Sequence, residues 1–174
     1  SPCAHERYRA HLWREGDPAR IEAGYKGSGP WGERAAREHG AQLEWYAAFA
    51  SLVAAEEFAR QERKAEAAAA YGRARTRFAA SAAAEPGFHD TASHFSCLAL
   101  AGQAWLALEA GEPAAALELF LQALAARPAS FRDRDGLGRS PEELGRRLRT
   151  EFSGQGMEAG LERLDQALKA VGVE

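Results

Sequence analysis

Residues 97–130 read CLALAGQAWLALEAGEPAAALELFLQALAARPAS. On both sides of Gly111, apolar and small residues recur at spacings of three and four, which is the pattern of amphipathic helices. Gly111 favours the end of one helix, Pro113 suits the first turn of the next, and Pro128 stops it. The stretch therefore predicts a pair of helices joined by a short turn, at about 91–110 and 112–127.

The composition extends this helical prediction to the whole chain. Alanine accounts for 40 of the 174 residues, and it is the strongest helix former while contributing little to sheets. With 46% hydrophobic and 27% charged residues, the chain has the length and the apolar content of a single globular domain. We expect an all-α protein, and an all-β domain is excluded.

Turn and cap residues divide the rest of the chain. Ser140 precedes Pro141 and two glutamates, which predicts a capped helix start. The other predicted helices are 2–15, 17–24, 33–61, 64–84 and 157–170, with a glycine-rich loop at 24–32. We expect an N-terminal helical segment and loop over 1–32 and a helical domain over 33–174, with helix pairs at about 33–84, 91–127 and 141–170.

The quoted stretch resembles a tetratricopeptide repeat (TPR), a helix–turn–helix unit of about 34 residues. That family places small residues where its two helices touch and a large apolar residue between them. Here the small residues are Ala104, Ala116 and Ala123, and the large one is Phe120. Leu100 and Ala104 stand where the family has an early Trp and Gly. Looser frames fit 48–81 and 141–172, and the resemblance implies a short superhelical array of antiparallel helix pairs.

TPR proteins bind their partners in a concave groove lined by the first helix of each pair. The resemblance therefore implies a protein–protein interaction or scaffold module that binds a peptide or a partner helix, and no enzyme. Trp105 and Arg149 are the expected anchors because their residue types dominate interface energetics, although Trp105 suits a core position equally well. The other expected groove residues are Phe49, Glu56, Arg60 and Leu108, with Leu52, Leu98, Ala101, Glu109, Arg146 and Phe152 beside them.

A second hypothesis is a metal- or small-ligand-binding helical protein. Asp90, His94 and Cys97 fall at i, i+4 and i+7 of a predicted helix, which places three zinc-ligand types on one face. His89, or the pair Cys3 and His5, would complete the set. The alternative reading is a helix cap at Asp90, a partly exposed histidine and a core cysteine. This reading is favoured, so the sequence predicts no cofactor, with zinc as the alternative.

Residues 131–142 come close to a calcium-binding EF-hand loop. Asp133, Asp135, Gly136 and Glu142 stand at loop positions 3, 5, 6 and 12. Phe131 occupies position 1, where the loop needs an acid, so we expect no calcium site. The chain contains no recognisable nucleophile triad, phosphate loop or paired-carboxylate motif.

The charge and the cysteine content indicate which classes of partner and which cellular compartment suit this chain. A net charge of −3 gives no surface suited to nucleic acid, and no apolar run is long enough for a membrane span. Alanine and arginine enrichment is typical of GC-rich codon usage, so we expect a bacterial source. Cys3 and Cys97 would form a disulfide only if the N-terminal segment packs on the middle of the chain. We expect a cytoplasmic protein rather than an exported or lipid-anchored one. Self-association is a further option. Because the chain begins with Ser rather than Met, we also expect that some segment preceded Ser1.

Overall fold

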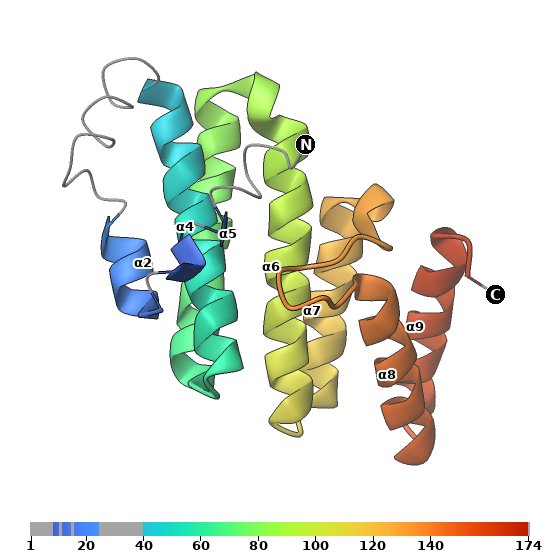
Figure 1. Ribbon diagram of the computed structural model, residues 1–174. Coiled ribbons are helices and arrows are strands. Elements are labelled where there is room, and N and C mark those ends of the chain that lie inside the picture. The colour runs from blue at the N-terminus through green and yellow to red at the C-terminus, as the bar shows by residue number, and fades with distance from the viewer. Residues whose placement is uncertain (1–8, 11, 15, 25–39, 174) are drawn as a thin grey trace. The chain divides into compact units, whose positions relative to one another are not determined.

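The computed structural model describes residues 9–10, 12–14, 16–24 and 40–173, and every regular element in these ranges is helical (Figure 1). The prediction of an all-α protein is confirmed. The elements are α2 (Pro18–Gly24), α4 (Gly40–Arg60), α5 (Lys64–Ala84), η1 (Pro86–Phe88), α6 (His89–Glu109), α7 (Pro113–Ala126), η2 (Pro128–Ser130), α8 (Pro141–Gly154) and α9 (Glu158–Ala170).

The chain divides into two compact units, residues 1–95 and 96–174, and the division lies within α6. In the first unit, α4 and α5 pack along their length and α2 packs on α4. Both helices carry fully buried small side chains, which allow two helices to approach closely. The fully buried alanines include Ala50, Ala54, Ala67, Ala70 and Ala74.

Aromatic rings fill one end of the first unit. Trp45 and Phe49 of α4 stack with ring centroids 5.4 Å apart, and Phe78 of α5 stacks on Phe95 of α6 at 5.6 Å. Phe49 meets Phe95 edge to face at 5.1 Å. Such pairs add about 0.5–1.5 kcal/mol to the stabilisation from burial alone, so the rings tie the start of α6 to the helix pair.

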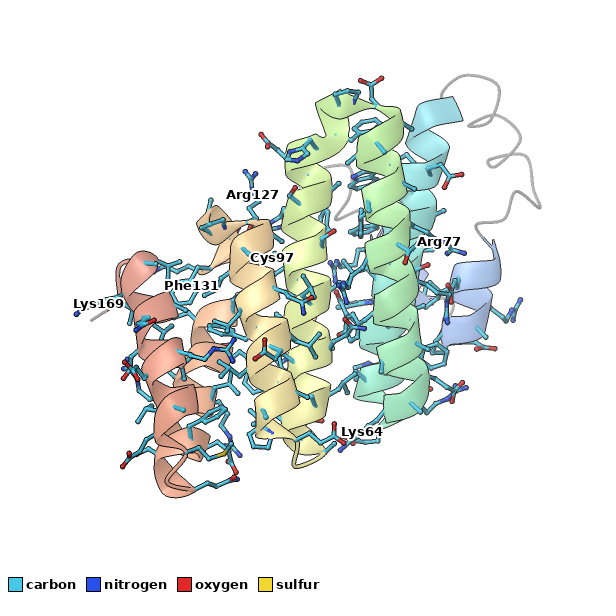
Figure 2. All side chains as sticks on the ribbon, turned by 180° about the vertical axis from the view of Figure 1, so that it is seen from behind. Lys64, Arg77, Cys97, Arg127, Phe131 and Lys169 are labelled. Carbon is cyan, nitrogen blue, oxygen red and sulfur yellow. The ribbon has the colours of Figure 1, made fainter. Side chains whose placement is uncertain are left out.

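A cluster of charged side chains attaches α2 to α4 and α5. Glu22 accepts hydrogen bonds from Arg73 at 2.6 and 2.7 Å, from Ser51 at 3.0 Å and from Arg77 at 3.3 Å. Arg77 also donates to Ser51, and Figure 2 shows Arg77 on α5. Burial raises the pKa of Glu22, but the bonds from Arg73 and Ser51 and the two arginine charges outweigh it, so the pKa lies below its ordinary value.

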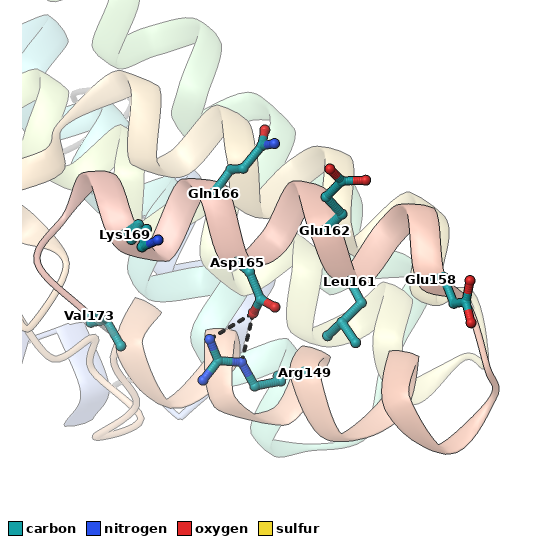
Figure 3. Close-up of a pocket in the computed structure, with 8 residues that line it drawn as sticks. All are labelled: Arg149, Glu158, Leu161, Glu162, Asp165, Gln166, Lys169 and Val173. Carbon is teal, nitrogen blue, oxygen red and sulfur yellow. Dashed lines mark hydrogen bonds and ion pairs between the residues drawn. The ribbon is translucent and has the colours of Figure 1, made fainter.

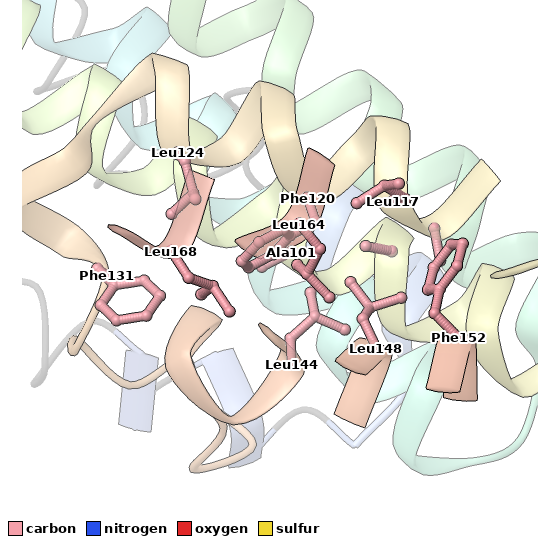
Figure 4. Packing of buried hydrophobic residues seen from close by; sticks show 12 residues of the cluster. Ala101, Leu117, Phe120, Leu124, Phe131, Leu144, Leu148, Phe152, Leu164 and Leu168 are labelled. Carbon is pink, nitrogen blue, oxygen red and sulfur yellow. The ribbon is translucent and has the colours of Figure 1, made fainter. Parts of the chain in front are cut away.

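In the second unit, α7, α8 and α9 enclose a core together with the end of α6 (Figure 4). The large side chains of this core are nearly inaccessible to solvent. They are Leu117, Phe120, Leu144, Leu148, Phe152, Leu164 and Leu168. Each contributes roughly 1.5–3 kcal/mol relative to an exposed position, so this core holds the two C-terminal helices on α7.

Two glycines set the spacing between these helices. A Cβ atom on Gly160 of α9 would lie 2.2 Å from a ring carbon of Phe152. A Cβ atom on Gly145 of α8 would lie 3.0 Å from Leu168 and 3.1 Å from Phe120. The rings therefore rest directly against helix backbone, which only glycine permits at Gly160.

The helix predictions agree closely with the structure where it describes the chain. The predicted helix 64–84 is α5, and the predicted capping box is present, because Ser140 accepts from Glu143 N–H at 3.3 Å and Glu143 accepts from Ser140 N–H at 3.1 Å. The predicted helix 91–110 begins two residues earlier, at His89. The predicted loop 24–32, most of the predicted helix 2–15 and the boundary at 32/33 lie outside the described residues.

The expected packing role of the alanines is confirmed. Ala67, Ala74, Ala104, Ala116 and Ala123 are each fully buried. Ala79, Ala80 and Ala82 to Ala84 have a sequence explanation only in helix propensity; of these, Ala82 is half-buried and the other four are exposed. The side of the helix on which an alanine lies therefore decides its role. Buried alanines let neighbouring helices approach closely, and exposed ones contribute only their helix propensity.

Acid should loosen the attachment of α2. Because the pKa of Glu22 is lower in the folded protein than in the unfolded chain, its stabilising contribution is present above the unfolded-state value and is lost as the pH falls through the folded-state value. Glu22→Gln should lower the free energy of unfolding at pH 7 by about 1–3 kcal/mol. Urea denaturation at pH 7 and at about pH 3 measures both effects.

Glu66→Gln is the control, since Glu66 forms an exposed ion pair with Arg63 and such pairs contribute little. Its denaturation curve should stay close to that of the wild type. Identical curves for Glu22→Gln and the wild type at both pH values would contradict the role given to this cluster.

A single added methyl group at Gly160 should destabilise the second unit. Gly160→Ala should lower the free energy of unfolding by about 1–3 kcal/mol because the buried ring of Phe152 must move. Gly154→Ala is the matched control, since no heavy atom lies within 4 Å of its Cβ position. The control should be neutral or slightly stabilising, as alanine is the better helix former. Equal melting temperatures for the two variants would refute the packing argument.

Candidate functional site

The α4 residues expected to bind a partner lie beneath the protein's own N-terminal segment. Phe49 and Glu56 are both fully buried. The Arg9 guanidinium lies 5.3 Å from the ring centroid of Phe49 and forms an ion pair with Glu56. Arg60 is exposed and donates to Glu57 at 2.6 and 2.9 Å. The expectation that Phe49 and Glu56 form an open surface is therefore wrong. Both side chains are buried, and Arg9 contacts the ring of Phe49 and pairs with the carboxylate of Glu56.

The expected anchor on α6 is also covered by the chain itself. The Arg139 guanidinium lies 5.2 Å from the ring centroid of Trp105, which is half-buried, as is Leu108. Both side chains pack against the core of the second unit. Trp105 therefore follows the core interpretation of its sequence position, because it packs against the core and a cation of the same chain covers its ring.

The loop that carries Arg139 is fixed by Asp135. Asp135 Oδ1 accepts hydrogen bonds from the backbone N–H groups of Leu137 at 2.9 Å and Arg139 at 2.8 Å. Asp135 Oδ2 accepts from the Arg139 side chain at 3.3 Å. Two of the acids in the stretch that resembles a calcium loop therefore have partners within the chain. Asp135 accepts hydrogen bonds from the backbone of its own loop, and Glu142 forms ion pairs with Arg132 and Arg146.

Arg149, the second of the two expected anchors, lies beside an open groove of about 570 Å³ on α8 and α9 (Figure 3). Its Nε and Nη2 atoms donate to Asp165 Oδ1 at 2.9 and 2.7 Å, which links α8 to α9. The groove has apolar side chains, Leu161 and Val173, among charged ones. The remaining lining residues are Glu158, Glu162, Gln166 and Lys169.

The charges in this groove differ in how they are compensated. Asp165 is paired with Arg149. Among the described residues, no ion-pair partner is found for Glu158, Glu162 or Lys169. On the neighbouring face of α9, by contrast, Arg163 binds Glu118 of α7. The groove therefore contains both a compensated carboxylate, Asp165, and charged groups with no ion-pair partner among the described residues.

Of the groove residues, sequence reasoning identified only Arg149. Leu161 belongs to the looser TPR frame over 141–172, where it was predicted as a packing residue, and it does pack, partly buried, against the core of the second unit. The missed signal is the spacing of residues 158, 161, 162, 165, 166 and 169 along one side of α9, followed by Val173. Sequence patterns alone do not say that this largely charged side lines a groove, whereas Leu164 and Leu168 are buried in the core.

The four proposed zinc ligands on α6 do not form a site by themselves, and Cys3 and His5 lie outside the described residues. His89 and Asp90 are exposed, with 3.6 Å between His89 Nδ1 and Asp90 Oδ1. His94 packs edge to face against Phe95 at 4.8 Å, and Cys97 is fully buried. In the part of the chain that the structure describes, no three His, Cys, Asp or Glu side chains gather in a way that could hold a metal ion. The zinc alternative has no geometric support.

Cys97 is a buried free thiol on α6 (Figure 2). It packs with Leu100 and Ala123 in a small apolar cluster. Burial, with a smaller effect of the Asp133 charge, raises the pKa of this thiol to about 12. It is therefore protonated at neutral pH, and its expected core role agrees with its surroundings. Cys3 lies outside the described residues.

Comparisons with protein-family models, with curated proteins and with solved structures gave no match in any of the three. Of the helices that the structure describes, none has the length and apolar character needed to cross a lipid bilayer. The conclusions about function therefore depend on the groove and on the residue pattern alone.

The thiol of Cys97 should be unreactive in the folded protein. In a Cys3→Ser variant at pH 8, a thiol reagent such as dithionitrobenzoate should modify Cys97 at least about a hundredfold more slowly than in the same variant unfolded in urea, because the reactive thiolate is scarce and the sulfur is buried. Absorbance at the wavelength of the released thiolate measures both rates. Rapid modification under native conditions would show that this core opens readily.

Proposed function

We propose that this protein is a protein–protein interaction module built from TPR-like helix pairs, and that it binds an amphipathic helix of its partner in the groove between α8 and α9. The observation that carries the proposal is the groove itself, about 570 Å³, with apolar side chains surrounded by charges. Grooves of this kind accept helices through anchors spaced by three and four residues.

The packing of the helices supports the TPR-like part of the proposal. In this family, small residues are needed where the paired helices touch, and Ala104, Ala116 and Ala123 are fully buried. Phe120, the large apolar residue of the frame, belongs to the core of the second unit. No enzymatic activity is included in the proposal, because the groove offers no nucleophile paired with a base.

The condition of the other expected faces also favours the groove. Arg9 occupies the face at Phe49 and Glu56, and Arg139 occupies the ring of Trp105. A partner would have to displace these cations first, whereas the groove is open. Of the two anchors expected from the sequence, Arg149 therefore remains in the proposal and Trp105 does not.

The charges specify the chemistry of the partner helix. Glu158 and Glu162 lie in the N-terminal half of α9, and Lys169 lies near its C-terminal end. The matching helix needs an apolar ridge for Leu161 and Val173, a basic residue opposite the two glutamates and an acidic residue opposite Lys169. Charges arranged in this way select the orientation of the partner more than they increase affinity.

A charge in the apolar part of the groove should abolish partner binding. Leu161→Glu should reduce the amount of each specifically retained protein by at least about tenfold in a quantitative pull-down from an extract of the source organism, because it buries an unpaired carboxylate. Mass spectrometry with isotope labels measures the retained amounts, and copies of this chain are counted separately. Glu162→Lys, at an exposed position, provides a second variant if Leu161→Glu does not fold.

Ala125→Glu is the matched control, since it adds the same carboxylate at an exposed alanine of α7 outside the groove lining. It should retain the same proteins as the wild type. Circular dichroism and thermal melting confirm that each variant is folded. If both groove variants are folded and retain the wild-type set in wild-type amounts, the groove is not a binding surface and the proposal is wrong.

A further inference from the structure

We infer that the occupant of the groove is a second copy of this chain, with the α9 helices of the two copies packed antiparallel about a twofold axis. The inference rests on the proposed function, because it uses the same groove. It adds the identity of the partner, which the arrangement of charge along α9 points to.

The groove residues of α9 form a single stripe. Glu158, Leu161, Glu162, Asp165, Gln166 and Lys169 of α9 line the groove, together with Val173, which follows the end of the helix at Ala170. The six helical residues lie on one side of α9, while Leu164 and Leu168 are buried in the core and Leu161 packs partly against it. A helix of this length extends about 20 Å, so the stripe is long enough to seat another helix of the same size.

The charge order along the stripe is self-complementary only in the antiparallel orientation. The acidic groups Glu158 and Glu162 precede the basic group Lys169. A twofold axis between residues 165 and 166 places Glu162 of each copy opposite Lys169 of the other copy. A parallel arrangement would instead place Glu162 against Glu162, where like charges repel. α9 therefore supplies a basic residue opposite Glu162 and an acidic residue opposite Lys169, while Glu158 lies opposite Val173 of the other copy.

The two Asp165 carboxylates near the twofold axis repel each other little, because each is paired with Arg149 of its own copy. Arg149 donates two hydrogen bonds to it at 2.9 and 2.7 Å. The Asp165 side chains of the two copies would lie near the axis, and without Arg149 they would repel each other. Lys169 and Glu162 have no ion-pair partner among the residues that the structure describes, so both are available for the other copy.

The expected dimer is weak. A single pair of crossed helices about 20 Å long buries less surface than the roughly 1,200–2,000 Å² of a stable interface. Antiparallel helices also bring opposite ends of their dipoles together, which favours this orientation slightly. We therefore expect association in the micromolar range or weaker.

Charge exchange tests the pairing directly. Sedimentation equilibrium from about 10 to about 500 µM should show a reversible dimer for the wild type. Lys169→Glu alone and Glu162→Lys alone should each weaken it by at least about tenfold, because two attractive pairs become two repulsive ones. The double variant with both exchanges restores opposite charges and should regain dimerisation. An equal mixture of the two single variants should form the mixed dimer for the same reason.

Arg147→Glu is the control, with the same change of charge as Lys169→Glu at an exposed position of α8 outside the groove lining. It should dimerise as the wild type does. All the substituted positions are exposed, so each variant should fold as the wild type does. Circular dichroism checks that a loss of dimerisation is not a loss of folding.

A wild type that stays monomeric over this range, or single variants that dimerise unchanged, would overturn the inference. So would a double variant that fails to recover. If the chain is monomeric while Leu161→Glu still loses a foreign partner that Ala125→Glu retains, the proposed function stands and only the identity of the occupant is wrong. If the groove variants affect neither measurement, both proposals fall.

Discussion

The structure depends on how closely its helices can approach one another. Helix axes come near only where the side chains between them are small, and in this chain alanine and glycine supply those positions. At Gly160 the ring of Phe152 rests against the backbone of α9, and no larger residue fits there. This spacing sets the position of α9 on α8, and with it the distance between Arg149 and Asp165 on which the groove depends.

Each unit uses an arginine to cover an aromatic ring that its helices leave accessible. Arg9 lies over Phe49 in the first unit, and Arg139 lies over Trp105 in the second. A guanidinium is well suited to this role because it stacks on a ring and still donates hydrogen bonds at its edge. The chain thus covers two faces that its sequence presents as binding surfaces, whereas the groove on α8 and α9 is open.

The helices were predictable because their signals are local. Pro113 and Pro128 mark a helix start and a helix stop wherever the chain folds, and Ser140 caps α8 through a residue only three positions away. The burial of Ala104, Ala116 and Ala123 followed from their spacing. Of the residues that line the groove, sequence patterns identified only Arg149. The burial of Glu56 was not predictable, because nothing near it in the sequence indicates that residue 9 will pair with it.

The sequence by itself determined the helical class, most helix ends and the alanines that act as spacers, since propensity, capping and periodicity act over a few residues. The tertiary structure alone decided which faces remain open. Contacts such as Arg9 with Glu56, Glu22 with Arg73 and Arg139 with Trp105 join residues that are 47, 51 and 34 positions apart. Whether such residues meet depends on the path of the whole chain, and local patterns do not encode that path.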